Sequence, residues 1–228
     1  MNTDSANSAP LRDQRLGDIA RTLAGATAVL RRYRLDFCCG GDVTLRDAAL
    51  RRDIDVDAVE AELGALDPGA PPALPAAAGD LVAHIVTRFH DVHRAELPEL
   101  ITLAAKVERV HREHPAAPLG LADALQRMRD ELLQHMQKEE QILFPMMAAN
   151  PGARLDPPIQ RMRDEHDEHG EALSGLFALT DELALPDDAC NTWRALYLGL
   201  RKFTDDLTEH IHTENNILFP RFESGAAR

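Results

Sequence analysis

Two thirteen-residue segments of the chain carry the same pattern of histidine and glutamate. Residues 135–147 are HMQKEEQILFPMM and residues 210–222 are HIHTENNILFPRF, so an ungapped alignment pairs His135 with His210 and Glu139 with Glu214. A histidine and a glutamate four residues apart on a helix lie on one face, about 6 Å apart along the axis. Such a pair offers an imidazole nitrogen and a carboxylate to a metal ion.

A second pair of histidines extends this repeat. His90 lies 45 residues before His135, and His166 lies 44 residues before His210. Each is followed three residues later by another histidine, in HDVH and HDEH. The sequence therefore predicts two copies of one helical hairpin, each with a lone histidine and a His-x-x-x-Glu motif.

The elements that position these residues follow from three breaks in an otherwise helical pattern. The breaks HPAAPLG (114–120), NPGARLDPP (150–158) and LPDDA (185–189) separate four long helices, which predicts an up-down-up-down four-helix bundle. Each break lies close to the midpoint between consecutive motifs, and residues equidistant from a turn lie level in an antiparallel pair. We expect one layer of the core, on the order of 15 Å from one end, to contain His90, His135, Glu139, His166, His210 and Glu214.

Six such groups in an apolar core are costly unless something pairs with them. Two facing carboxylates can bridge two cations and four histidines can cap them, and a set without thiolates favours iron or manganese over structural zinc. A ferritin-like bundle instead needs Glu-x-x-His on two helices, and only Glu108 with His111 has that spacing. His111 lies about 31 Å beyond His90 along a straight helix, so we expect it at the other end of the bundle.

The remaining polar residues of the bundle have less specific positions. We expect His93 beside the layer or on the surface, His212 in solvent, and Glu165 as a candidate lining of an entry path. Cys190 lies at a helix start and is interpreted as structural, and Pro145 and Pro220 are expected to end or kink their helices.

Residues 1–66 form a predicted small helical domain, separated from the bundle (80–228) by the proline-rich linker DPGAPPALPAAAG (67–79). One helix is expected from Leu16 to Tyr33, and shorter ones from Thr44 and after Asp55. The vicinal Cys38 and Cys39 lie in a glycine-containing turn. They are either a redox or metal-handling pair or a buried turn.

Composition excludes some functions. The 228 residues carry a formal net charge of −13, which argues against a nucleic-acid partner. The sequence contains no run of 18 apolar residues, so no membrane-spanning helix is expected. No signal peptide is visible, and three cysteines make no disulfide framework, so we expect a cytoplasmic protein.

The motifs together resemble a known family. HDVHR (90–94), LPELITLAAKVERVH (97–111), HMQKEEQILFP, EHDEHGE (165–171) and HIHTENNILFP are similar to the hemerythrin-like domain of the iron–sulfur cluster repair di-iron proteins of the RIC, or YtfE/ScdA, type. DFCCGG (36–41) resembles the short cysteine-bearing domain of that family. The resemblance implies two iron ions per chain in a non-haem centre, bridged by Glu139 and Glu214, with His90, His135, His166 and His210 as terminal ligands.

The resemblance also implies a stress-associated function. Such proteins help to restore iron–sulfur clusters damaged by nitric oxide or oxidants, by supplying iron to damaged or apo iron–sulfur proteins. The same ligand set is compatible with a nitric oxide reductase that forms nitrous oxide, and with a reversible binder of O2 or nitric oxide. The cysteine domain favours repair over simple gas binding, and a cysteine domain on a proline-rich tether is compatible with a homodimer.

Overall fold

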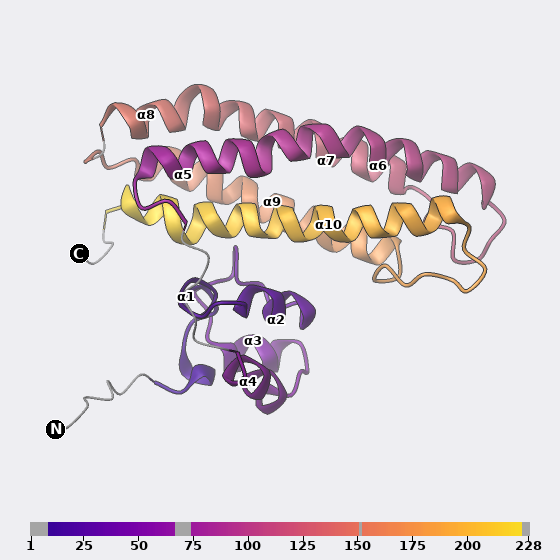
Figure 1. Cartoon of the computed structure of the whole chain (residues 1–228), viewed down its shortest axis with the longest axis horizontal. Coiled ribbons are helices and arrows are strands. Elements are labelled where there is room, and N and C mark those ends of the chain that lie inside the picture. Colours follow the sequence, from indigo (N-terminus) through magenta and orange to yellow (C-terminus); the bar gives the residue numbers. More distant parts are fainter. Residues whose placement is uncertain (1–8, 67–73, 151, 225–228) are drawn as a thin grey trace. The chain divides into compact units, whose positions relative to one another are not determined.

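The computed structural model describes residues 9–66, 74–150 and 152–224, and every regular element in these ranges is a helix (Figure 1). The predicted all-α class is confirmed. The chain divides into two compact units, residues 1–74 and 75–228. The boundaries 1–66, 67–79 and 80–228 stay a prediction, because residues 67–73 lie outside the described ranges and the first bundle helix begins at Ala78, inside the predicted linker. No helix in the described ranges is long and apolar enough to cross a membrane.

The first unit is a small helical domain built from α1 (Leu16–Thr22), α2 (Ala26–Arg32), α3 (Leu45–Arg51) and α4 (Val56–Gly64). Two side chains fix helix starts, since the Thr44 hydroxyl accepts from the Asp47 amide at 3.1 Å and the Asp55 carboxylate accepts from the Asp57 amide at 2.9 Å. The helices share one fully buried core, which includes Ile19, Leu30, Phe37, Leu45 and Leu63.

The single helix expected from Leu16 to Tyr33 is wrong. The chain breaks between α1 and α2 at Gly25, whose φ of +82° lies in the left-handed region that glycine adopts without strain. Apolar residues on both sides of the break face the same core. Their spacing in the sequence therefore continues across the break, and the turn cannot be recognised from that spacing.

The second unit is a bundle of four rods, and consecutive rods run in opposite directions (Figure 1). The predicted up-down-up-down topology is confirmed. The first rod is α5 (Ala78–Ile85), a π-helical turn (Val86–His90) and α6 (Asp91–Val110), and the second is α7 (Leu121–Lys138), a π turn (Glu139–Leu143) and α8 (Phe144–Ala149). The third rod is α9 (Asp156–Leu179), and the fourth is α10 (Asn191–Thr213), a π turn (Glu214–Leu218) and a 3-10 turn (Phe219–Arg221).

Two of the π turns occupy equivalent positions in the repeat and precede a proline. Pro145 follows Glu139–Leu143 and Pro220 follows Glu214–Leu218. Proline lacks an N–H and its ring clashes with the preceding turn of an α-helix, so a widened turn accommodates it. The second rod continues through Pro145 as α8, so the helix does not end there. Of the two expected effects of this proline, an end or a kink, only the first is excluded.

The bundle interior is apolar along most of its length. Fully buried side chains fill it, among them Leu97, Leu132, Trp193, Leu200 and Phe203. Near the end that contains α5, buried histidines and glutamates replace them. The fold therefore concentrates its buried histidines and glutamates near one end of the bundle.

Candidate metal centre

All four rods contribute to one buried cluster, which we call the metal centre. His90 closes the π turn of the first rod, while Glu139 and Glu214 open the π turns of the second and fourth. The histidines of the two His-x-x-x-Glu motifs lie in the last turns of α7 and α10, and His166 lies within α9. Six side chains, each at most 1% exposed, make up the centre: His90, His135, Glu139, His166, His210 and Glu214.

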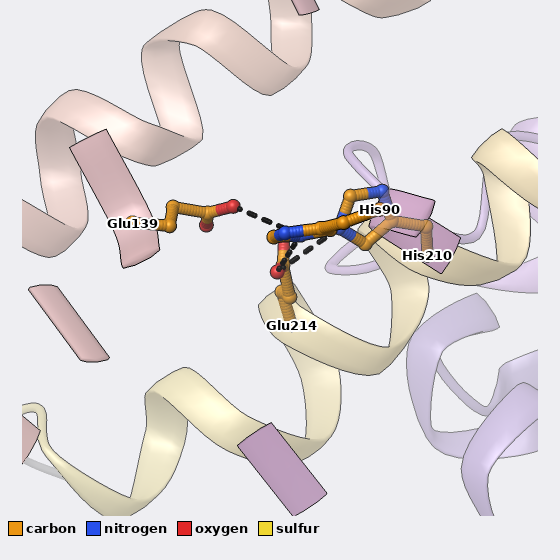
Figure 2. Close-up of side chains that lie close together, drawn as sticks. All are labelled: His90, Glu139, His210 and Glu214. Atoms are coloured by element: carbon orange, nitrogen blue, oxygen red, sulfur yellow. Dashed lines mark hydrogen bonds and ion pairs between the residues drawn. The ribbon is translucent and has the colours of Figure 1, made fainter. Parts of the chain in front are cut away.

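The six side chains form two overlapping groups of four that share both glutamates. One group joins His90 and His210 to the two carboxylates (Figure 2), and the other joins His135 and His166 to the same carboxylates. Within each group the candidate ligand atoms all lie within 4.8 Å of one another. Each group is therefore the size of a single metal site.

The two glutamates lie between the two pairs of histidines. Glu214 places Oε1 3.1 Å from His210 Nε2 and Oε2 3.1 Å from His166 Nε2, so its two oxygens face different groups. Glu139 lies between the other two histidines, with Oε2 3.4 Å from Nε2 of each. Each carboxylate therefore lies against one histidine from each group.

Several polar atoms of the centre lack a hydrogen-bond partner or face an atom of the same kind, and a cation would satisfy them. Neither carboxylate oxygen of Glu139 has a hydrogen-bond partner among the described residues, although both are buried. The Nε2 atoms of His90 and His210 face each other at 3.0 Å, and those of His135 and His166 at 3.1 Å. Burying a polar group without a partner is unfavourable, and a bound cation would be ligated by the imidazole nitrogens and the carboxylate oxygens together.

The outward nitrogens of three imidazoles are held by neighbouring side chains. His90 Nδ1 donates to Glu140 at 2.7 Å, His135 Nδ1 donates to Glu165 at 3.0 Å, and His166 Nδ1 donates to the Asn215 side-chain oxygen at 2.8 Å. Such bonds fix the ring orientation and leave Nε2 for a metal. His210 Nδ1 has no partner among the described residues, and its ring stacks on Phe89 at 5.3 Å between centroids.

The electrostatics of the centre follow from burial beside carboxylates. Burial opposes protonation of His90, but Glu139 and Glu214 outweigh it and raise the pKa of His90 to about 10. The hydrogen bond from His135 lowers the pKa of Glu165 to about 2 against the effect of burial, and Lys138 adds to it. Without a metal, the cluster therefore balances its negative charge with protons on histidine.

Two further histidines are buried next to the centre. His93 is 0% exposed and His169 is 3% exposed. His93 was expected beside the layer or on the surface, and no position was expected for His169. Burial lowers the pKa of His93 to about 2 and that of His169 to about 3. The H-x-x-H spacing in both copies of the repeat was the signal that could have found them.

Two further expectations are corrected. His212 is not in solvent but 2% exposed, because every residue from His210 to Asn215 is buried at this end of the fourth rod. Glu165 is not the lining of an open path but 4% exposed. It accepts hydrogen bonds from His135, from Lys138 at 2.7 Å and from Arg161 at 2.8 Å.

His111 lies away from the metal centre, at the far end of the bundle. Its Nε2 is 3.2 Å from the Sγ of Cys190, the residue that precedes α10, and its ring packs on Trp193 at 5.0 Å between centroids. His210 lies 20 residues after Cys190 along α10, so about 30 Å of helix separates Cys190 from the metal centre. Hydrogen bonds from the Trp193 amide and from His111 lower the pKa of Cys190 to about 7. The structural role expected of Cys190 stays a prediction.

The cysteine pair of the first unit lies in the turn expected from the sequence. The Asp36 carboxylate accepts from the Cys38 amide at 3.2 Å, the Cys38 thiol at 3.3 Å and the Cys39 amide at 2.9 Å, and the two sulfurs are 3.7 Å apart. The hydrogen bond with Cys39, together with burial, raises the pKa of Cys38 well above its ordinary value. A redox role for the pair stays a prediction.

Comparisons with known proteins agree with this architecture. Residues 81–222 match the hemerythrin HHE cation binding domain, and residues 12–67 match ScdA_N, a domain of unknown function (DUF542). The first match covers the bundle with its buried histidines and glutamates. It implies that the bundle binds a metal, whereas the number and identity of the ions and the role of each ligand stay predictions.

Curated relatives match nearly the whole chain. The iron–sulfur cluster repair protein YtfE of Dickeya chrysanthemi (strain Ech1591) is 50% identical over 92% of this chain and 96% of its own length. The protein of that name from Musicola paradisiaca (strain Ech703) is 50% identical over 95% of this chain and 99% of its own length. The one from Escherichia coli O81 (strain ED1a) is 47% identical over 94% of this chain and 98% of its own length. The two domain matches and this similarity over both domains show that the chain belongs to the YtfE family of iron–sulfur cluster repair proteins.

Proposed function

We propose that this chain holds two iron ions per molecule and repairs damaged iron–sulfur clusters by giving up that iron. The observation that carries the proposal is the pair of glutamates shared between two groups of ligands, because shared carboxylates suit a dinuclear centre. The name of the curated relatives supports cluster repair as the purpose of the centre. In this proposal Glu139 and Glu214 bridge the ions and the four histidines of the centre cap them.

The residues around the centre suit a site that both holds iron and releases it. When bound, the iron pair supplies ferrous ions and open positions for nitric oxide or O2. Glu140, Glu165 and Asn215 hold three of the imidazoles in place, so the ligands stay arranged in the absence of metal. With a pKa of about 10, His90 takes up a proton at neutral pH once iron leaves, and this proton offsets the charge of the buried carboxylates.

The partners in this proposal are proteins with damaged or incomplete iron–sulfur clusters, under nitrosative or oxidative stress in the cytoplasm. The repair name of the relatives supports the protein partners. Cys38, Cys39 and Cys190 form no disulfide within the described residues, which is compatible with a reducing compartment.

Iron transfer in the presence of a chelator tests the proposal. A protein whose four-iron cluster has lost one iron is mixed with the reduced, iron-loaded chain, dithionite and excess ferrous chelator, and the cluster absorbance is followed. We expect recovery from the loaded chain and none from an equal amount of free ferrous iron, which the chelator captures. The Glu139→Leu chain should fail and the His111→Leu chain should succeed. Loss of recovery by the native chain whenever chelator is present would refute direct donation.

A further inference from the structure

Two histidines outside the metal centre are buried without a hydrogen-bond partner among the described residues. In both His93 and His169, neither Nδ1 nor Nε2 makes a hydrogen bond within the described part of the chain. Neutral imidazole carries one donor and one acceptor, and protonated imidazole carries two donors, so either form leaves two polar atoms unsatisfied. Buried polar groups are nearly always hydrogen-bonded in folded proteins, and unsatisfied ones therefore indicate a missing partner.

The two residues occupy equivalent positions in the internal repeat. His93 follows His90 by three residues on α6, and His169 follows His166 by three residues on α9. Three residues of helix advance about 4.5 Å, and the first and third rods run in the same direction (Figure 1). Both imidazoles therefore lie on the same side of the metal centre, one turn toward the middle of the bundle.

The surroundings of the two rings restrict where a partner can lie. The His93 ring is 5.4 Å from the ring of His210 and 5.5 Å from that of Phe203, and it stacks on Phe89 at 6.5 Å. The His169 ring is 5.2 Å from the ring of His135. The phenylalanines offer no hydrogen-bonding atom, whereas the imidazoles of His210 and His135 belong to the metal centre, so a ligand bound at the centre would lie close to both rings.

We propose that His93 and His169 form a binding site for a small polar ligand of the metal pair, with one hydrogen bond to the ligand from each ring. The ligand class is a molecule or anion of two or three atoms with lone pairs, such as nitric oxide, dioxygen or azide. Both rings are buried, which favours a small ligand, and the repeat places one imidazole beside each group of ligands. The inference rests on the proposed dinuclear centre and adds to it a pair of residues that select what the centre binds.

Azide binding to the oxidised, iron-loaded chain tests this site, with visible absorbance as the readout. We expect His93→Leu and His169→Leu each to keep two irons per chain and to weaken azide binding about tenfold, or about 1.4 kcal/mol. Glutamine keeps an N–H donor, so His93→Gln and His169→Gln should recover part of the affinity. His114→Phe, which removes a histidine at the far end of the bundle, is the control and should bind azide as the native chain does.

A second measurement uses the metal-free chain. Because leucine at these positions removes unsatisfied polar atoms, the metal-free leucine variants should unfold at the same denaturant concentration as the native chain or at a higher one. Unchanged azide affinity in well-loaded leucine variants would overturn the site, and so would loss of iron from them, which would make the two histidines direct metal ligands. If the native chain itself holds no iron pair, the proposed function fails first, and iron analysis before the titration separates the two failures.

Discussion

Glu139 and Glu214 are carboxylates with no exposure to solvent, in a chain whose formal net charge is −13. A buried carboxylate keeps its charge only when a cation or several donors face it, and both oxygens of Glu139 lack a donor among the described residues. At the scale of single residues, a cation would therefore supply the partner that Glu139 lacks among the described residues.

Replacing either bridge tests this directly. We expect Glu139→Leu or Glu214→Leu to remove the spectrum of a bridged iron pair and to lower the metal content far below two ions per chain. The metal-free Glu139→Leu chain should be more stable than the metal-free native chain by about 1–3 kcal/mol, since an unsatisfied buried group is removed. Metal analysis and denaturant titration measure the two effects. His111→Leu, at the far end of the bundle, should leave the metal content nearly unchanged.

The thiols of the chain differ in their predicted reactivity. Because the pKa of Cys190 is lowered to about 7, its thiolate should increase as the pH rises through 7, while the raised pKa of Cys38 keeps that thiol protonated. Iodoacetamide labelling followed by peptide mass spectrometry should show Cys190 modified first, with a midpoint near pH 7. His111→Leu should move that midpoint to higher pH. An unmoved midpoint would show that His111 does not lower the pKa.

At the scale of elements, the two halves of the bundle hold their imidazoles differently. Glu165 accepts a hydrogen bond from His135, but the equivalent position in the first half is Phe89, whose ring stacks on His210 and offers it no hydrogen bond. The His135–His166 group has two anchored imidazoles, and the His90–His210 group has one. An anchoring residue of this kind contributes roughly 10–100-fold in metal affinity.

We therefore expect a chelator to remove the two ions in two phases, with the ion of the His90–His210 group leaving first. Glu165→Gln should speed the slower phase by roughly 10-fold or more, and Glu168→Gln, an exposed change on the same helix, should alter neither rate. Absorbance of the chelated iron against time measures both rates. A single phase in the native chain would contradict the difference between the halves.

The sequence predicted the four long helices of the bundle and the six side chains that meet in the centre. It could do so because helical spacing and the midpoints between motifs are geometric constraints. It did not predict the π turns, since residues such as those from Glu139 to Leu143 are equally compatible with α-helix. His93 lies about 60° around the helix from His90, between core and surface, and spacing alone cannot decide its side. His212 was misplaced because its burial depends on how other elements cover the end of α10.

At the scale of the whole molecule, each of the two units has its own core. The first unit packs around side chains such as Phe37, and the bundle packs around Trp193 and its neighbours. All six residues of the metal centre belong to the second unit. The bundle should therefore be able to bind metal without the cysteine domain.

Expression of residues 75–228 alone tests this independence. We expect this fragment to bind as many ions per chain as the full chain does and to unfold in one cooperative thermal transition, because no ligand and little of the bundle core is lost. Circular dichroism and metal analysis provide the measurements, with the full chain as control. A fragment with less than half the metal content of the full chain would show that the cysteine domain is needed to complete the site.

Each of the two equivalent hairpins contributes one glutamate, and both ligand groups contain both glutamates. This arrangement has a consequence for the ancestry of the chain. One hairpin supplies a lone histidine and a His-x-x-x-Glu motif, which is half of each ligand group. Two copies of a chain of half this length, related by a twofold axis, would assemble the same ligand set. A gene duplication that fused such a homodimer would free the halves to diverge, and the exchange of Glu165 for Phe89 between equivalent positions is the kind of difference that only a fused chain can acquire.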